Sequence, residues 1–289
     1  MLENDKWTTL KVLQWTKDYL GSKGVKNARL ESEWMLCHVC EVDRVGLYLQ
    51  YDKPLNEKEL FTYRNMISRR ARREPLQHIL GSQEFYGFDF DVTADVLIPR
   101  QDTECIIEAV LQIDKIPETI LDVGAGSGCL SVVLKKLFAN SDVTATDISK
   151  EALRVARLNA DKHGVNIEFL IGSLFTPLSD RKFDLIVSNP PYIPTADIMN
   201  LEIEVRDFDP MLALDGGGDG LEIYRKIIPE ALNHLNPAGW LVLEVGVFQA
   251  EEVINIFNNS ADYSGIKIKR DYGNIDRVLY AQKRDKNEE

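Results

Sequence analysis

Residues 119–134 read TILDVGAGSGCLSVVL and decide the fold of the larger part of this chain. The apolar run at 119–123 has the length of a buried strand, and a helical pattern follows the glycine-rich turn at 124–128. In α/β folds the ligand binds beyond the carboxyl end of such a strand, where glycines let the backbone approach it closely. The stretch therefore predicts a cofactor site in a sheet covered by helices.

The chain after this stretch alternates between apolar strands and helical segments. Four further runs have strand character, at 142–146, 167–171, 183–188 and 240–245, and a helix is expected over 149–163. This alternation predicts a mostly parallel, Rossmann-like α/β sheet with helices on both faces. The final two runs, 265–270 and 275–281, leave no room for a crossover helix between them and are expected to pair antiparallel.

The first third of the chain has a different pattern, in which only helices are expected. Residues 1–80 are assigned to a small all-α domain, in which Asn56 and Glu59 have capping-box spacing. Residues 81–95 are assigned to a β-hairpin linker, because aromatic and polar residues alternate around Gly87. Residues 96–289 form the larger α/β domain.

Two acids beside the glycine loop separate the possible cofactors. Asp147 ends the second strand, about 20 residues after the loop, where an acid commonly binds ribose hydroxyls. Asp122 precedes a G-x-G-x-G turn rather than the G-x-G-x-x-G turn of dinucleotide folds. An acid at this place would repel a pyrophosphate but not a cationic sulfonium. S-adenosylmethionine, with S-adenosylhomocysteine as its product, is therefore the favoured cofactor over a nicotinamide dinucleotide.

The strand at 183–188 ends in Asn189-Pro190-Pro191-Tyr192, at the same edge of the sheet as the glycine loop. The Asn189 side-chain oxygen and the Pro190 carbonyl can each accept one N–H of a planar nitrogen. Two such bonds would aim the nitrogen at a methyl donor, while Tyr192 offers a flat face to the target. Asn189, Pro190 and Tyr192 are the candidate catalytic residues, and all four residues are candidates for binding the substrate.

These motifs and others along the chain resemble those of the peptide chain release factor glutamine N5-methyltransferases, over nearly the whole length of the sequence. The resemblance is carried in order by RARREPLQHILG at 70–81, LIPR at 97–100 with Thr103-Glu104, the loop at 121–128, Asp147, the Asn-Pro-Pro-Tyr turn, EVRDFDPMLAL at 204–214, LEVG at 243–246 and RDYGNIDRV at 270–278.

The resemblance implies a cytoplasmic enzyme that methylates the glutamine of the Gly-Gly-Gln motif in class I release factors. It also implies that the helical domain and the methyltransferase domain together hold the release factor's loop. The expected cofactor-binding residues are Asp122, Gly124, Ala125, Gly126, Ser127, Gly128, Asp147, Ile148, Leu174, Phe175 and Asn189.

Four positions depart from the pattern of that family. Gln101 stands where proline is common, and Ala125 stands where threonine is usual. Asp209 replaces a glutamate before Pro210, which shortens the carboxylate arm. Leu174 occupies a position where some members present an aromatic ring to the adenine, a contact that the neighbouring Phe175 could supply.

Composition limits the remaining possibilities. The 34 Lys and Arg against 46 Asp and Glu give a net charge of −12, which disfavours stable binding to duplex nucleic acid. The four cysteines are too scattered for a disulfide framework, and no metal site is expected. No apolar run approaches the roughly 18 residues that span a bilayer, so no membrane partner is expected. We interpret the chain as a monomer that acts in the cytoplasm. The basic tract at 69–73 is expected to be a solvated helix face, with a docking patch as the alternative.

Two other functions stay open at this stage. An amino methyltransferase acting on adenine N6 would use the same turn, because that nitrogen is also planar. A non-catalytic protein that only binds the cofactor is the other alternative, and a complete Asn-Pro-Pro-Tyr turn argues against it.

Overall fold

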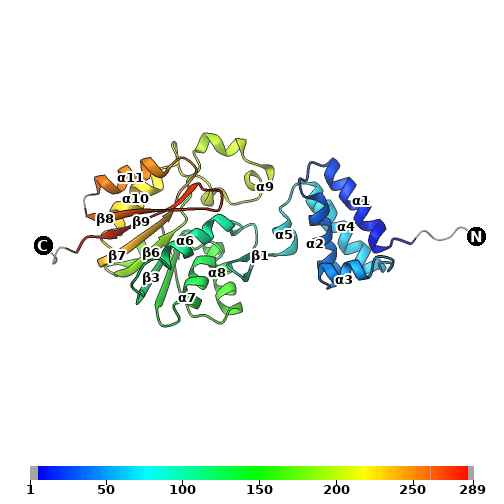
Figure 1. The fold of residues 1–289 in the computed structure, drawn as a ribbon, viewed down its shortest axis with the longest axis horizontal. Helices are drawn as coiled ribbons and strands as arrows, with labels where there is room; N and C mark the ends of the chain where they lie inside the picture. Colours follow the sequence, from blue (N-terminus) through cyan, green and yellow to red (C-terminus); the bar gives the residue numbers. More distant parts are fainter. Residues whose placement is uncertain (1–5, 261, 286–289) are drawn as a thin grey trace, which may run out of the picture. The chain divides into compact units, whose positions relative to one another are not determined.

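The computed structural model describes residues 6–260 and 262–285, which form two compact units (Figure 1). The first unit comprises the chain up to Gly81 together with Glu202–Phe208. The second comprises Ser82–Leu201 and the chain from Asp209 onward. A short segment from the middle of the sequence therefore belongs to the helical unit, which the sequence did not indicate.

The second unit is built on a seven-stranded sheet with the order β5-β4-β3-β6-β7-β9-β8. The strands from β5 to β7 are parallel, whereas β9 is antiparallel to both β7 and β8. The Rossmann-like fold with an antiparallel C-terminal pair is confirmed. The strands are β3 (Thr119–Val123), β4 (Asp142–Asp147), β5 (Glu168–Ile171), β6 (Phe183–Ser188), β7 (Leu235–Glu244), β8 (Tyr263–Arg270) and β9 (Asp276–Lys283).

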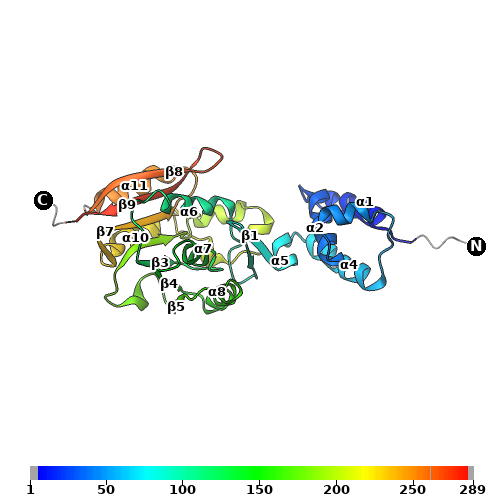
Figure 2. The same ribbon diagram turned by 60° about the horizontal axis from the view of Figure 1, so that its bottom comes forward.

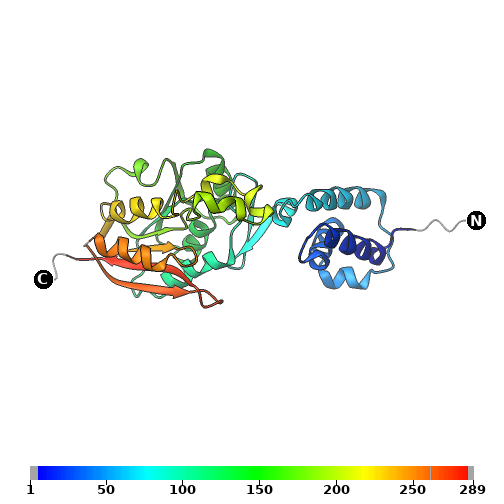
Figure 3. The ribbon, with the colours of Figure 1, turned by 90° about the horizontal axis from the view of Figure 1, so that it is seen from above.

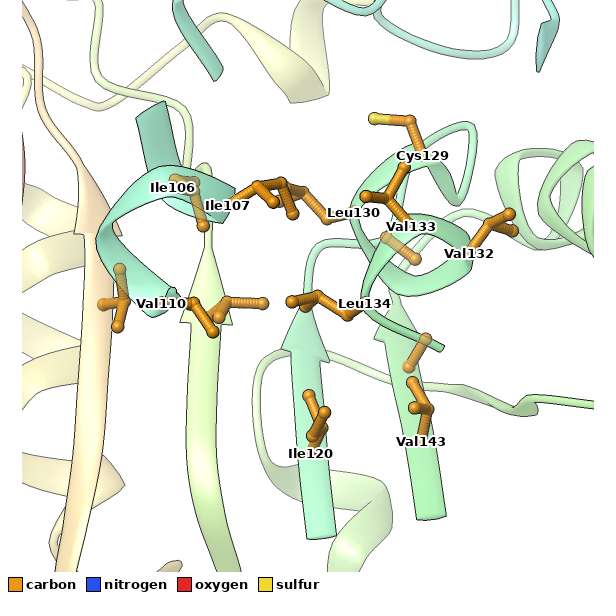
Figure 4. Packing of buried hydrophobic residues seen from close by; sticks show 14 of the residues in the cluster. Ile106, Ile107, Val110, Ile120, Cys129, Leu130, Val132, Val133, Leu134 and Val143 are labelled. Carbon is orange, nitrogen blue, oxygen red and sulfur yellow. The ribbon is translucent and has the colours of Figure 1, made fainter. Parts of the chain in front are cut away.

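Helices cover both faces of this sheet (Figures 1 and 2). On one face lie α6 (Glu104–Val110), α7 (Cys129–Leu137) and α8 (Lys150–Lys162), and on the other lie α10 (Glu222–Ala231) and α11 (Ala250–Asn259). Successive strand residues point to opposite faces, so Ile120 packs under α6 and α7 (Figure 4) while Leu121 joins the core under α10. Short 3-10 turns complete the unit: η1 (Gln101–Thr103), η2 (Thr176–Leu178), η3 (Thr195–Asn200) and η4 (Met211–Ala213).

The strand β7 begins five residues earlier than the apolar run at 240–245 indicated. Its first part, Leu235 to Gly239, contains proline and glycine and pairs with Phe183 before a register shift brings Trp240 opposite Leu185. An irregularity of this kind hides the start of a strand, because the period-2 pattern holds only after it.

The predicted hairpin forms, as β1 (Ser82–Phe85) paired antiparallel with β2 (Phe88–Asp91) around Gly87 at φ 77°. It groups with the α/β unit rather than standing apart as a linker. Phe85 and Phe90 belong to the hydrophobic core on the face of the sheet that α6, α7 and α8 cover, and Asn159 of α8 donates to the Asp91 carbonyl at 3.0 Å. Burial of its two aromatic rings thus attaches the hairpin to this unit.

The first unit is a bundle of α1 (Thr9–Ser22), α2 (Ala28–Cys40), α3 (Arg44–Leu49), α4 (Glu57–Ala71) and α5 (Leu76–Leu80), coloured blue to cyan in Figure 3. The segment Glu202–Phe208 adds α9 (Ile203–Arg206). Asn56 and Glu59 form the predicted capping box. The short helices α3 and α5 were not predicted, since neither is long enough to show a helical period.

The basic tract is only in part the solvated helix face that the sequence suggested, because Arg72 is exposed whereas Arg70 is not. Arg70 is buried and forms ion pairs with Glu31 and, at 3.0 Å, with Glu204. Arg73 binds the other Glu204 oxygen at 2.7 Å, and Arg69 pairs with Glu74. Arg70 and Arg73 therefore hold the returning segment inside the first unit, which leaves Arg70 unavailable as a docking residue. Glu31 and Glu204 are distant from these two arginines in sequence, so charge patterning along one helix could not reveal the pairs.

Among the residues that the structure describes, no helix is both long and apolar enough to cross a membrane. In the same residues, no group of three or more His, Cys, Asp or Glu side chains is placed to hold a metal ion.

Candidate active site

The glycine loop borders a cavity of about 400 Å³ at the carboxyl edge of the sheet, entirely within the second unit. Gly124 has φ 81° and Gly126 has φ 54°, and a Cβ on either would meet no atom within 4 Å. The space above these two backbones is therefore open toward the cavity that they line. The Gly124 N–H donates to the Thr146 carbonyl at 2.8 Å, which ties the loop to the neighbouring strand.

Gly128 has a different reason to be glycine. A Cβ at this position, where φ is 79°, would lie 3.0 Å from the Cβ of Ala156 in α8. The residue therefore permits the close packing of α7 against α8 and does not line the cavity. Gly128 packs against α8 on the side of the loop away from the cavity, whereas the cavity is lined by Gly124, Ala125, Gly126 and Ser127.

Asp147 ends β4 beside the loop and lines the cavity. Its Oδ2 accepts the Gly126 N–H at 2.9 Å, and its Oδ1 accepts the Ser149 N–H at 2.8 Å. Each carboxylate oxygen can accept a second hydrogen bond, so both keep capacity for ligand hydroxyls. Ile148, which is exposed, and Leu174, at φ 50°, also line the cavity.

The Asn-Pro-Pro-Tyr turn supplies another wall of the same cavity through Asn189, Pro190 and Pro191. The Asn189 Nδ2 donates to Oγ1 of Thr103 at 3.0 Å, so its Oδ1 is left to accept from a ligand. Ser188, at the end of β6, donates to the Val123 carbonyl at 2.6 Å. The turn and the glycine loop are thereby joined at their bases.

Tyr192 does not line the cavity. Its hydroxyl donates to Glu244 Oε1 at 3.2 Å, and its backbone carbonyl accepts from Gln249 Nε2 at 2.9 Å. Burial, together with the nearby Glu244 charge, raises the pKa of the Tyr192 hydroxyl. The side chain thus stays neutral and anchors the end of the turn to the strand β7.

Asp122 and Phe175 likewise lie behind the cavity rather than in it. Asp122 is fully buried and accepts from the Ser131 hydroxyl of α7, and burial raises its pKa to about 6. Phe175 is buried with its ring stacked on His234 at 4.9 Å between centroids. Leu174, not Phe175, is the side chain of this pair that borders the cavity.

Three residues near the cavity were missed as site residues from sequence. Thr103 and Glu244 contact the Asn-Pro-Pro-Tyr turn, and Arg100 lines the cavity while binding Asp209. A signal existed for Glu244, because it is the single acid in the otherwise apolar run at 240–245, which pairs with the strand that leads to Asn189. Burial raises the pKa of Glu244 to about 7, against lowering effects from the Thr103 hydrogen bond and the Arg277 charge.

Comparison with known proteins agrees with this geometry. Residues 11–81 match the PrmC N-terminal domain and residues 101–203 match the methyltransferase small domain. A release factor glutamine methyltransferase from Geobacter sulfurreducens is 51% identical over 94% of this chain and 96% of its own. The chain belongs to the release factor glutamine methyltransferase family. This membership identifies the chain as an enzyme of an S-adenosylmethionine-dependent family, as the resemblance had implied.

More distant members and structures extend the comparison. A release factor glutamine methyltransferase from Moorella thermoacetica is 41% identical over 92% of this chain and 95% of its own. The crystal structure of a methyltransferase from Pyrococcus furiosus has a TM-score of 0.53 at 22% identity, covering 75% of this chain and 98% of that one. The second likeness shows the methyltransferase fold.

Proposed function

We propose that this enzyme transfers a methyl group from S-adenosylmethionine to the side-chain amide N5 of the glutamine in the Gly-Gly-Gln motif of class I peptide chain release factors. The observation that carries the proposal is the fixed Asn189 side chain. Because Nδ2 donates to Thr103, Oδ1 is left as an acceptor at the cavity wall. Family membership supports the choice of release factors as the substrate class.

The cavity fits the cofactor. The open space above Gly124 and Gly126 accepts a ligand at backbone distance, and Asp147 retains acceptor capacity for ribose hydroxyls. When bound, S-adenosylmethionine supplies an electrophilic methyl group on a cationic sulfonium. The chain's own residues would place the acceptor in line with that methyl.

Asn189 and Pro190 would hold the acceptor amide. A glutamine side chain presents two N–H donors in one plane, and the Asn189 Oδ1 with the Pro190 carbonyl provides two acceptors. Both residues line the same cavity as the glycine loop. Orientation at attack distance contributes most of the acceleration, since the amide nitrogen is a weak nucleophile. The held nitrogen would take the methyl group and lose one amide proton to solvent, and the cofactor would leave as S-adenosylhomocysteine.

An adenine N6 amine presents the same pair of N–H donors, so the turn alone does not choose between the two acceptors. The net charge of −12 favours a protein acceptor, because contact with duplex phosphates depends on basic side chains. The proposal also includes action as a monomer in the cytoplasm without stable binding to duplex nucleic acid.

Mass spectrometry of a release factor after incubation with enzyme and S-adenosylmethionine tests the proposal. A gain of about 14 Da, the size of one CH₂, is expected on the Gly-Gly-Gln glutamine. A release factor with that glutamine substituted and an adenine-containing DNA serve as parallel acceptors. Methyl transfer to the DNA, with the release factor unmodified, would reassign the enzyme to the adenine reaction. No transfer to either acceptor would favour a protein that only binds the cofactor.

A further inference from the structure

The side chain of Gln249 contacts the end of the Asn-Pro-Pro-Tyr turn without lining the cavity. Gln249 directly precedes α11, and its Nε2 donates to the Tyr192 carbonyl at 2.9 Å and, more weakly, to the Gly220 carbonyl at 3.5 Å. Its Oε1 accepts the Gly246 N–H at 3.0 Å. One amide group therefore joins three segments that are separate in sequence: the end of the turn, the loop that contains Gly220 and the loop that follows β7.

The backbone groups around this amide determine its orientation. A backbone N–H can only donate, so the atom that faces Gly246 is the oxygen, and the two hydrogens on Nε2 then face the two carbonyls. The fit is close, because a Cβ on Gly220 would lie 2.7 Å from Nε2 and a Cβ on Gly246 would lie 2.5 Å from Oε1. The amide is thus enclosed by backbone at both ends and has a single hydrogen-bonded orientation.

The backbone that leads to Gln249 contains a strained residue. The Gln249 N–H donates to the Gly246 carbonyl at 3.1 Å and closes a turn in which Phe248 has φ 67°. A residue with a Cβ adopts this left-handed conformation at a cost in free energy, and the Phe248 side chain, which is 93% exposed, does not offset the cost by burial. Such strain persists where the surrounding contacts determine the conformation, and the contacts of the Gln249 amide are among them.

The Asn-Pro-Pro-Tyr turn has few means of its own to hold its backbone in place. Its two prolines have no N–H, so neither can anchor the turn by donating a hydrogen bond. In the proposed reaction the Pro190 carbonyl has to remain available to the substrate amide. The Tyr192 carbonyl follows directly after the prolines, and it is the backbone oxygen that accepts from Gln249. Gln249 therefore holds the end of the turn without competing for the Pro190 carbonyl.

We propose that Gln249 is a positioning residue for methyl transfer, which fixes the Tyr192 carbonyl and thereby the direction of the two acceptors in the turn. Those acceptors are the Pro190 carbonyl and the Asn189 Oδ1. The inference rests on the proposed function, since it assigns a role within that same site. Gln249 acts through the backbone of the turn, and a small rotation of that backbone would misdirect both acceptors together. Transfer to a weak nucleophile is sensitive to such misalignment.

Gln249→Met tests this role, because methionine has a similar length but lacks the amide that donates to Tyr192 and accepts from Gly246. We expect kcat to fall at least tenfold, while the Kd for S-adenosylmethionine and the KM for the acceptor stay within threefold of wild type. A kcat within tenfold of wild type would overturn the proposal. A Kd or KM weakened more than threefold would also overturn it, because the cavity as a whole would then be disturbed rather than the alignment of the acceptor.

Gln282→Met is the matched control. Gln282 lies in β9 of the same unit, and its Nε2 donates to the Ala238 carbonyl at 2.9 Å, which is the same kind of bond at the same length. Neither of these two residues lines the cavity. We expect kcat of this variant to stay within threefold of wild type, and urea denaturation checks that both variants are folded. A larger fall in the control would mean that any lost bond to a carbonyl in this unit slows transfer, against a specific role for Gln249.

A double variant tests whether Gln249 acts through the turn. Asn189→Ala already removes one of the two acceptors, so adding Gln249→Met should lower kcat by no more than a further threefold. A purely structural role would repeat the loss of the single variant, and a further loss of more than threefold would therefore overturn the proposal. If Gln249→Met does not fold, Gln249→Ala decides. Gln249 is half-buried, so water can satisfy the three backbone groups in that variant without holding them, and a kcat within tenfold of wild type overturns the proposal.

The wild-type enzyme tests the proposed function, whereas the variants test Gln249. All variants are assayed on whichever acceptor the wild-type enzyme methylates. Methylation of a different acceptor in place of the release factor would refute the proposed function and leave the comparison of the Gln249 variants intact. Methylation of the release factor by wild type and by the Gln249 variants alike would refute the positioning role alone.

Discussion

Arg100 Nη2 lies 2.6 Å from Asp209 Oδ2, and the Asp209 side chain is fully buried while that of Arg100 is 42% exposed. Asp209 stands where the family resemblance implies a glutamate, whose arm is one methylene longer. The short arm still reaches its partner across 109 residues of sequence. Arg100 lines the cavity, and so does the segment Pro210–Ala213 that directly follows Asp209. The ion pair between Arg100 and Asp209 therefore holds one end of that segment in place.

Replacing Arg100 with Met leaves the Asp209 carboxylate buried without its cation. We expect the free energy of unfolding to fall by about 1–3 kcal/mol at pH 8, the scale for stranding a buried charged acceptor. Burial already raises the pKa of Asp209 to about 6 with Arg100 present, so its loss shifts that pKa further upward. At pH 5 the group can hold a proton and the cost should shrink. Urea unfolding at the two pH values measures this, and an equal loss at both would contradict the assignment.

Asp147→Ala is expected to weaken binding of S-adenosylmethionine by about 1–3 kcal/mol, the value of lost hydrogen bonds to a charged group. The carboxylate lines the cavity and keeps acceptor capacity beyond the bonds to Gly126 and Ser149. Calorimetric titration of the cofactor gives the affinity. Asp142→Ala, at the other end of β4, is the control and should bind the cofactor normally. Wild-type affinity in a folded Asp147→Ala protein would remove this residue from the cofactor site.

Two glycines in one loop should respond differently to alanine. Both have positive φ and therefore share a similar backbone strain. At Gly128 the new methyl also lies 3.0 Å from the Cβ of Ala156. This overpacking should lower the free energy of unfolding by a further 1–3 kcal/mol or roughly that much. At Gly126 the methyl enters the open cavity, and the main loss should be cofactor affinity, at least tenfold. Thermal unfolding and calorimetry on the two variants measure the contrast, and equal stability losses would argue against the packing role of Gly128.

The sequence sufficed for those features that depend on local pattern. The strand β3, the glycine loop and the Asn-Pro-Pro-Tyr turn are each continuous in sequence, and parallel strands bring their carboxyl ends to one edge. The sequence alone therefore predicts that the three segments lie around a common cavity. The irregular start of β7 and the six-residue helix α3 carry no periodic signal and were missed.

The partnerships between distant residues could not be predicted in the same way. Glu204 joins the helical unit through Arg70 and Arg73, which lie more than 130 residues before it, so nothing in local sequence indicates the pairing. Phe175 illustrates the opposite error. Its aromatic ring suggested contact with an adenine, but the ring stacks on His234 in the core. Side-chain direction in the loop that follows a strand depends on packing that a one-dimensional pattern does not contain.

Asp122→Asn is expected to change how stability depends on pH. In the folded protein burial raises the pKa of Asp122 to about 6, from an ordinary value of 3.8, so the folded state binds this proton more tightly than the unfolded chain. The stabilising contribution is complete below 3.8 and is lost as the pH rises to about 6. Asparagine does not titrate, so the variant lacks this loss. From pH 4.5 to pH 7.5 the free energy of unfolding of the variant should therefore rise by about 2 kcal/mol relative to that of wild type. Urea denaturation of both proteins at both pH values measures this. An equal difference in the free energy of unfolding at the two pH values would mean that Asp122 is ionised throughout, against the prediction.

Asn189→Ala is expected to lower kcat at least a hundredfold while the Kd for S-adenosylmethionine stays within threefold of wild type. The side chain is held by Thr103 at 3.0 Å and lines the cavity beside Pro190, so it should orient the acceptor rather than bind the donor. Loss of an orienting contact lowers the rate of transfer because the weak amide nucleophile depends on its alignment. Single-turnover methylation of a release factor, with calorimetry of cofactor binding, separates the two effects, and Asn200→Ala, at an exposed position in η3, is the control. A kcat within about tenfold of wild type would mean that alignment by this side chain is not the main source of the rate.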